Sequence, residues 1–133
     1  MGCSVVMSKI LLAEDDTDMR RFLVKALQNA GFDVTSYDNG LSAYHRLREE
    51  PFELLLTDIV MPEMNGIELA ERVVGLREGI RVLFMSGYAE GGPGLGHPGA
   101  TLLHKPFRAA ELLGTVRRLI DGPRVGEEPI AAR

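Results

Sequence analysis

Short runs of apolar residues recur along the chain and alternate with longer segments in which apolar residues return every three or four positions. The run KILLA at residues 9–13 is uniformly apolar after its lysine, as expected for a strand covered on both faces of a sheet. Further strands are predicted at residues 32–37, 53–57, 81–86 and 101–104. Strands that alternate with helices in this way indicate an α/β protein with a five-stranded parallel sheet.

The helices between these strands are predicted from the spacing of their apolar residues. Asp16 or Thr17 caps a first helix, whose apolar positions follow the i, i+3, i+4 spacing until Gly31 ends it. A second helix is expected at residues 41–50, where Pro51 closes it, and two more at residues 66–76 and 108–120. The side chains assigned to the inner faces include Phe22, Leu23 and Leu27 in the first helix and Leu69, Val73 and Val74 in the third.

The segment AEGGPGLGHPGA, between Tyr88 and Thr101, breaks the alternation. It contains five glycines and two prolines at the place where a regular (βα)5 pattern puts its fourth helix. Each glycine costs a helix about 1 kcal/mol and each interior proline about 3 kcal/mol relative to alanine. The summed penalty is on the order of 10 kcal/mol, more than one short helix recovers by packing. The fourth helix of the alternation is therefore predicted to be short or absent.

The two ends of the chain lack these patterns. Residues 1–7 are expected to be a disordered leader, with Met7 as an alternative start, and residues 121–133 a flexible C-terminal tail. Between them, residues 8–120 form one globular domain, which is large enough to bury a core without disulfides or metals. No apolar stretch reaches the length of a membrane-spanning helix.

Composition narrows the class of protein. Fifteen basic and nineteen acidic residues give a net charge of −4, which argues against broad nucleic-acid binding. Cys3 is the only cysteine, so an internal disulfide is excluded and a reducing compartment suits the chain. We therefore expect a cytoplasmic protein that contacts neither nucleic acid nor membrane.

Several polar residues follow directly on the predicted strands. Because the carboxyl ends of parallel strands meet at one edge of a sheet, the acids after the first strand should lie near Asp58. Two carboxylates about 5 Å apart repel each other by roughly 3 kcal/mol at an effective dielectric constant of 20. Such a cluster requires raised pKa values or a cation, and oxygen ligands favour a hard ion such as Mg²⁺. The residues placed at this edge are Glu14, Asp15, Asp16, Asp58, Ser86 and Lys105.

Each of these residues also has an ordinary structural interpretation. Glu14 and Asp15 would favour the dipole of the helix that follows, and Asp16 would cap it. Ser86 would end a strand, and Lys105 with the next proline would interrupt a loop. A shared site accounts better for all of them on one sheet edge, while Asp16 keeps the capping role alone.

Four motifs in order, LLAEDD, LLLTDIVMPEMNG, VLFMSG and LHKPF, resemble the receiver domain of two-component response regulators over residues 8–120. The resemblance implies a flavodoxin-like (βα)5 fold. It also implies that Asp58 is the phosphoacceptor, Ser86 the switch hydroxyl and Lys105 the lysine of the site. The stretches ILLAEDDTDMRRFLVKAL and LLLTDIVMPEMNGIELA look closer still to CpdR-type stand-alone regulators of alphaproteobacterial cell-cycle phosphorelays.

The chemistry implied by this family is phosphoryl transfer to Asp58 from a phosphohistidine on a histidine kinase or histidine phosphotransferase. Mg²⁺ would be held by Asp15, Asp58 and the backbone carbonyl of Val60, with Glu14 holding a metal-bound water. Lys105 would pair with a phosphoryl oxygen, and its bond to the following proline is usually cis in the family.

The sequence departs from the family pattern at two places. The family usually couples the switch hydroxyl to a Tyr or Phe three residues before the lysine, and here that position is Leu102. Many receivers dimerise through a surface that includes the fourth helix, which the glycine-rich segment here disfavours. We therefore expect a switch of Ser86 and Leu102 without the usual aromatic rotation, and a monomeric protein.

Three functions remain open. The resemblance favours a phosphorylation-controlled adaptor for the ClpXP protease, which binds the ClpX unfoldase when unphosphorylated. A phosphate shuttle within a phosphorelay would use the same site. A metal-dependent phosphatase is disfavoured, because no second aspartate follows two residues after Asp58 to act as acid and base. The chain is thus expected to catalyse only its own phosphorylation and dephosphorylation. The first helix carries a mixed-charge face, which is either an ordinary solvated surface or, as is usual in the family, the contact for a helical phosphotransfer partner; it comprises Asp18, Arg20, Arg21 and Lys25.

Overall fold

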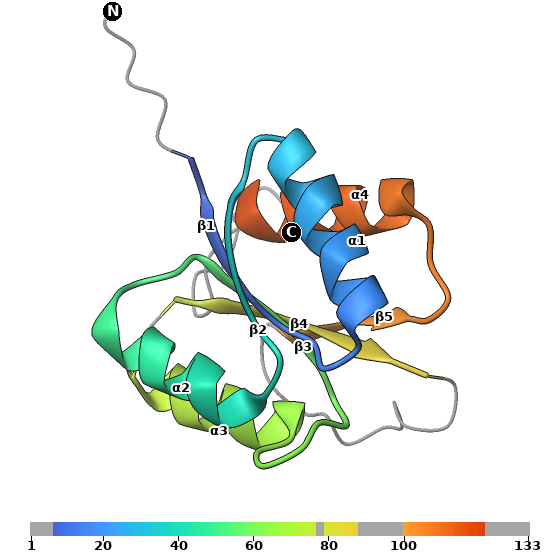
Figure 1. Cartoon of the computed structure of the whole chain (residues 1–133). Helices are drawn as coiled ribbons and strands as arrows, with labels where there is room; N and C mark the ends of the chain where they lie inside the picture. The colour runs from blue at the N-terminus through green and yellow to red at the C-terminus, as the bar shows by residue number, and fades with distance from the viewer. Residues whose placement is uncertain (1–6, 77–78, 88–99, 122–133) are drawn as a thin grey trace, which may run out of the picture.

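The computed structural model describes residues 7–76, 79–87 and 100–121 (Figure 1). The elements are, in order, β1 (Lys9–Ala13), α1 (Thr17–Asn29), β2 (Asp33–Tyr37), α2 (Gly40–Glu49), β3 (Leu54–Asp58), α3 (Gly66–Leu76), β4 (Arg81–Ser86), β5 (Ala100–His104) and α4 (Ala109–Asp121). The five predicted strands and four predicted helices are present, with ends that shift by one or two residues. The predictions about both chain ends and about the glycine-rich segment lie largely outside these residues. Within them, no helix is long and apolar enough to cross a membrane.

A single parallel sheet forms the centre of the domain, with the strand order β2-β1-β3-β4-β5. Ile10 of β1 pairs with Val34 of β2 on one side and with Leu54 of β3 on the other. Helices α1 and α4 cover one face of this sheet and α2 and α3 cover the other (Figure 1). The strand order reverses between β1 and β3, and ligands of such sheets bind at the carboxyl ends of the strands at this point. The predicted flavodoxin-like fold is confirmed.

The central strands β3 and β4 consist mainly of apolar residues because both of their faces are buried, and their polar residues lie at the strand ends. Every residue of β3 and β4 is buried. Side chains alternate between the faces, so that Leu55 joins the core under α2 and α3 while Leu54 and Leu56 join the core under α1 and α4. Burial of one such side chain contributes roughly 1.5–3 kcal/mol. The two apolar cores therefore hold the strand ends, and the polar residues on them, in fixed positions.

The helix ends follow from single residues. Asp16 caps α1 by accepting a hydrogen bond from the Met19 amide at 2.8 Å, as predicted. Gly31 adopts a φ of +97°, the left-handed conformation in which helices commonly end. Glu50 is extended, which is the conformation favoured for the residue before a proline, and α2 ends there.

Two side chains predicted to face the core lie at the surface instead. Phe22 of α1 and Val74 of α3 are each 39% exposed, whereas their neighbours Leu23 and Val73 are fully buried. Successive residues of a helix point about 100° apart, so a residue beside a core position lies at the margin of the apolar stripe. Apolar spacing alone does not show on which side of that margin a residue falls.

Candidate phosphoacceptor site

Three carboxylates meet at the carboxyl edge of the sheet, at the ends of β1 and β3. Oxygen atoms of Glu14, Asp15 and Asp58 all lie within 4.8 Å of one another. Glu14 is fully buried and Asp58 is 6% exposed, whereas Asp15 is open to solvent. The strand order thus brings these acids together, as the polar residues after the strands suggest. Their oxygen atoms form a donor set suited to a hard cation.

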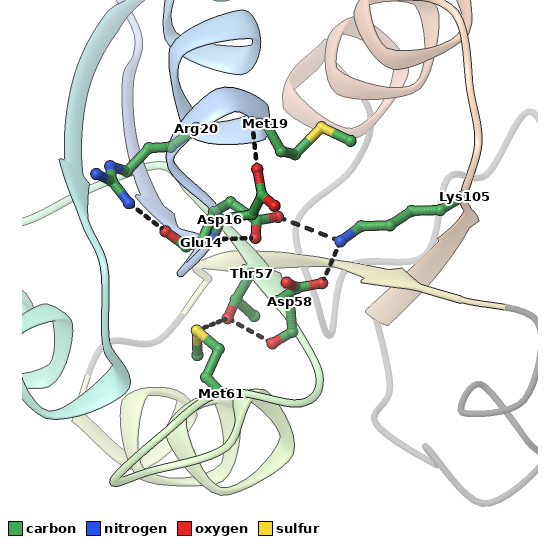
Figure 2. Close-up of polar contacts among 8 residues, drawn as sticks. All are labelled: Glu14, Asp16, Met19, Arg20, Thr57, Asp58, Met61 and Lys105. Carbon is green, nitrogen blue, oxygen red and sulfur yellow. Dashed lines mark hydrogen bonds and ion pairs between the residues drawn. The ribbon is translucent and has the colours of Figure 1, made fainter.

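Lys105, which follows β5, supplies the positive charge of this cluster. Its Nζ lies 2.8 Å from Oδ1 of Asp58 and 3.3 Å from Oε1 of Glu14 (Figure 2). The Lys105-Pro106 peptide bond is cis, as predicted. Burial alone would lower the pKa of Lys105, but its hydrogen bond with Asp58 and the charges of Asp58 and Glu14 raise that pKa above its usual value. The ammonium group therefore stays charged and offsets part of the repulsion between the two carboxylates.

Glu14 is the most confined of the three acids. Burial raises its pKa to about 7, and a hydrogen bond with Asp58 and the charge of Asp58 act in the same direction. The backbone amide of Asp16, which donates to Oε2 at 3.0 Å, and the charge of Lys105 oppose the rise. In the metal-free protein at neutral pH, Glu14 is consequently divided between its protonated and charged forms. The sequence predicts that crowded carboxylates need either raised pKa values or a cation. The pKa of Glu14 is raised.

The backbone after β3 is held in place by a close approach at Gly66. The Gly66 amide donates to the carbonyl oxygen of Ile59 at 2.8 Å, and a Cβ atom on Gly66 would overlap the carbonyl oxygen of Asp58. The hydroxyl of Thr57 donates to the same Asp58 carbonyl at 2.9 Å (Figure 2). Glycine at this position thus serves more than the turn for which the Asn65-Gly66 pair is suited. It lets the start of α3 rest directly on the strand end that carries Asp58.

The same loop contains a γ-turn that faces α2. The Met64 amide donates to the Pro62 carbonyl at 2.8 Å, and Glu63 between them has a φ of 72°. Such a backbone conformation in a residue other than glycine costs on the order of 1–3 kcal/mol and is found mainly at functional sites. A Cβ atom on Gly40, the first residue of α2, would overlap the carbonyl oxygen of Met64. The loop after Asp58 is therefore packed against α2 as well as α3.

Ser86 and Leu102 lie on the neighbouring strands β4 and β5. Ser86 is fully buried, and its hydroxyl donates to the carbonyl oxygen of Gly87 at 2.6 Å. Leu102 pairs with Phe84 across β4 and β5 and packs, half-buried, against the core under α2 and α3. Val60 follows Asp58 by two residues, and its side chain is 60% exposed. The roles predicted for Ser86, Leu102 and the Val60 carbonyl remain predictions.

Arg20 makes a contact beside the acidic cluster that the sequence did not reveal. Its Nη1 donates to the main-chain carbonyl of Glu14 at 2.8 Å (Figure 2). This bond ties the first turn of α1 to the end of β1, next to the acidic cluster. A main-chain acceptor leaves no mark on residue type, so only the position of Arg20 one turn into the helix could have suggested the contact.

The family model of the response regulator receiver domain matches residues 10–117, and the chain therefore belongs to the receiver domains of two-component response regulators. Among curated proteins it is similar to the response regulator receiver protein CpdR of Brucella abortus (strain 2308). The identity is 53% over 117 residues, which cover 86% of this chain and 98% of CpdR. It is also 33% identical over 115 residues to the transcriptional regulatory protein CusR of Escherichia coli (strain K12), of which the chain spans about half, 51%.

Solved structures agree on the fold. A response regulator receiver protein from Sinorhizobium medicae WSM419 superimposes with a TM-score of 0.83 at 27% identity, over 90% of this chain and 98% of that one. The receiver domain of the sensor histidine kinase PA1611 from Pseudomonas aeruginosa PAO1, which has a magnesium ion coordinated in its active site cleft, gives a TM-score of 0.77. It is 21% identical over 88% of this chain and all of that chain, which supports the shared fold alone.

Proposed function

We propose that this receiver accepts a phosphoryl group on Asp58 from a phosphohistidine of a histidine kinase or histidine phosphotransferase. The observation that carries the proposal is the position of Lys105, whose Nζ lies 2.8 Å from Oδ1 of Asp58, one of three converging carboxylates. An oxygen nucleophile beside a fixed cation is the arrangement that phosphoryl transfer needs, because this reaction depends mainly on positioning and charge neutralisation.

Mg²⁺ is the cofactor that the acidic cluster fits. Asp15, Asp58 and the main-chain carbonyl of Val60 would hold the ion, and Glu14 would hold one of its bound waters. The donors are all oxygen atoms, and Lys105 supplies a single positive charge against three carboxylates that lie within 4.8 Å of one another. When bound, the ion supplies positive charge that offsets the charge of the incoming phosphoryl group. A magnesium ion in the PA1611 receiver shows that this fold can hold one.

The transfer itself exchanges one bond to phosphorus for another. A carboxylate oxygen of Asp58 forms a bond to phosphorus while the bond from phosphorus to the imidazole nitrogen breaks, and the electron pair of that bond stays on the nitrogen. Lys105, now shared between Asp58 and Glu14, moves to pair with a phosphoryl oxygen. The first turn of α1, tied to Glu14 by Arg20, holds one wall of the site still while the phosphoryl group enters.

Ser86 provides the link from the phosphoryl group to the rest of the domain. Its hydroxyl donates to the adjacent Gly87 carbonyl and would turn to donate to a phosphoryl oxygen instead. A hydrogen bond to a charged group is worth about 1.5–3 kcal/mol, enough to shift a two-state balance roughly 10- to 150-fold. Leu102, half-buried on β5 against the core, would follow this movement in place of an aromatic side chain.

The output is a change in protein contacts within the cytoplasm. The resemblance to CpdR-type regulators leads us to propose that the protein is an adaptor for the ClpXP protease and binds the ClpX unfoldase in its unphosphorylated form. It would act as a monomer, without nucleic acid or membrane. A phosphate shuttle uses the same site and differs only in where the phosphoryl group goes next.

Phosphorylation is tested with a small phosphodonor such as phosphoramidate in the presence of Mg²⁺, followed by intact-mass measurement. We expect one phosphoryl group on the wild type and none on Asp58→Asn. The matched control is Asp33→Asn, since Asp33 is an exposed aspartate at the opposite end of the sheet. Phosphorylation of Asp58→Asn at the wild-type rate would refute the assignment.

The output is tested by capture of purified ClpX on the immobilised protein. Asp58→Ala should retain ClpX, and the phosphorylated wild type should release it. Equal capture by both forms, or by neither, would rule out the adaptor, and transfer of the label from Asp58 to a histidine phosphotransferase would then identify a shuttle. Light scattering in beryllofluoride tests the oligomeric state, because a tight dimer there contradicts the expected monomer.

A further inference from the structure

A second charged surface lies between α1 and the edge strand β2. The groove there has a volume of about 630 Å³ and is lined mainly by α1, with Ser36 contributed by β2. Its lining includes three cations, Arg20, Arg21 and Lys25, together with the apolar Val24. These residues recur at i, i+1, i+4 and i+5, so they form one stripe along the helix. The groove is thus lined by a basic stripe of α1 beside the edge strand of the sheet.

In the part of the chain that the structure describes, no acid forms an ion pair with the three cations of this groove, although Asp18 lies on the same helix. Across residues 7–76, 79–87 and 100–121, the ion pairs involve other cations than the three named, since those that pair are Lys9, Arg46, Arg72 and Lys105. Arg20 is held by a neutral acceptor, the main-chain carbonyl of Glu14. The whole chain has a net charge of −4, so this surface departs from the overall charge of the protein. It attracts anions locally while the rest of the molecule repels large polyanions.

The other wall of the groove is an open sheet edge. In the strand order β2-β1-β3-β4-β5, the strand β2 pairs with β1 alone among the described elements. Within the described residues its outer side therefore has no neighbouring strand, and an extended peptide can pair with the outward amides and carbonyls as an added strand. A basic helix face beside such an edge suits a peptide that is both extended and acidic.

The spacings of the two walls match. Arg21 and Lys25 are four residues apart on α1, about 6 Å along a helix axis. Alternate residues of an added strand, which point to the same face, are about 6.6 Å apart. We propose that this groove docks an extended acidic peptide of a partner protein, which adds to the free edge of β2 and places alternate carboxylates against Arg21 and Lys25. The helical phosphotransfer partner expected on α1 would leave this sheet edge unused, so the inference goes beyond the proposed function.

A nucleic acid fits the groove less well than an acidic peptide. Three cations neutralise few phosphates, whereas binding to nucleic acid draws its affinity from many such contacts along the backbone. The net charge of −4 repels a long polyanion, but a short peptide with two or three carboxylates samples only the local field. The free hydrogen-bonding edge of β2 adds main-chain pairing that only a polypeptide satisfies.

The charge part of the proposal is tested with a capped, fluorescent heptapeptide that alternates threonine and glutamate, and with a matched peptide that has glutamine in place of glutamate. Fluorescence anisotropy of the whole unphosphorylated chain should give a Kd about tenfold lower for the glutamate peptide. Arg21→Glu with Lys25→Glu should remove that preference. Arg117→Glu with Arg118→Glu, the same charge change on the exposed side of α4, should keep it.

The strand part is tested with two versions of the glutamate peptide, N-methylated at its odd or at its even positions. Because alternate amides of a strand face one neighbour, one version should bind as before and the other should lose binding. Equal affinity of both versions, a preference for the glutamine peptide, or tighter binding of a single-stranded oligonucleotide at equal salt would each overturn the proposal. Asp58→Asn should bind the peptide like the wild type, which separates this result from the fate of the phosphoacceptor.

Discussion

The two charged regions beside α1 treat their charges in opposite ways. The acidic cluster buries Glu14 and Asp58 almost completely and holds both against Lys105. The basic groove leaves Arg21 and Lys25 exposed to solvent, with no ion pair in the described part of the chain. Water screens the charges of the groove, whereas the charges of the cluster act through an environment of lower dielectric constant.

This difference shows that like charges affect the free energy of the protein far more when they are buried than when water screens them. In the groove, the cations cost little to hold together and are available to a partner. In the cluster, burial and the neighbouring Asp58 disfavour the charged form of Glu14 and raise its pKa, although Lys105 partly opposes the rise. We therefore expect the cluster to be sensitive to protons and to Mg²⁺, and the groove to be sensitive chiefly to salt.

Gly66→Ala should have the largest effect, because it breaks the packing on which the buried cluster depends. The new methyl group would overlap the Asp58 carbonyl oxygen, a backbone atom that cannot yield easily. We expect a loss of at least about 3 kcal/mol in the free energy of unfolding, measured by urea denaturation.

The control for this substitution is Gly114→Ala in α4. A Cβ atom on Gly114 would meet nothing within 4 Å, and alanine favours a helix over glycine by up to about 1 kcal/mol. Gly114→Ala should therefore stabilise the protein slightly. A similar response to the two substitutions would contradict the close approach at Gly66.

The pH dependence of stability should come next in size. The pKa of Glu14 in the folded, metal-free protein is raised from 4.5 to about 7, so the folded state binds more protons than the unfolded state between these values. The resulting stabilisation is present below pH 4.5 and is lost as the pH rises to 7. In EDTA, wild type should lose up to about 3 kcal/mol more than Glu14→Gln between pH 5 and pH 8.

Glu71→Gln serves as the matched control for this measurement, since Glu71 is an exposed glutamate on α3. It should follow the wild-type pH profile. If Glu14→Gln and the wild type lose equal stability over the same pH range, the burial of a titrating Glu14 is wrong.

Mg²⁺ should stabilise the protein through the acidic cluster alone. An ion present at one hundred times its Kd adds about 2.7 kcal/mol to the stability of a protein that binds it only when folded. Asp15→Asn should lose most of this gain in thermal unfolding at neutral pH, and its exposed position means that the metal-free fold should be unaffected. A full magnesium response in Asp15→Asn would remove that residue from the ligand set.

The smallest effect is expected from the basic groove. Arg21→Glu combined with Lys25→Glu should change the free energy of unfolding by less than about 0.5 kcal/mol, because both side chains are exposed and form no ion pair with the residues that the structure describes. The same urea denaturation experiment measures it. A large loss of stability would show that these cations support the fold, and would blur the contrast with the cluster.

The sheet and the convergence of the acids could be predicted from the sequence because both follow from the pattern of apolar strands. Uniformly apolar strands mark a parallel sheet, and the residue after each strand must then lie at one edge. Asp58, Glu14 and Lys105 could be placed together on that basis, although they are far apart along the chain. The cap at Asp16 and the end of α2 before Pro51 follow equally from local backbone preferences.

The remaining features depend on tertiary contacts that leave no recognisable pattern in the amino-acid sequence. The exposure of Phe22 and Val74 is decided by how far each helix is rolled against the sheet. The bond from Arg20 to Glu14 ends on a main-chain oxygen, which every residue has. In the sequence, Gly40 is an ordinary residue before a predicted helix. Only the fold shows that the Met64 backbone lies against it.

The contact between Gly40 and Met64 has a mechanical consequence. No space separates the two backbones, so the loop after Asp58 cannot shift toward α2 unless the first turn of that helix moves as well. The end of β3 and the start of α3 are in equally close backbone contact at Gly66. A displacement of the backbone at Asp58 would therefore reach α2 and α3 together, on the face of the sheet opposite α1 and α4.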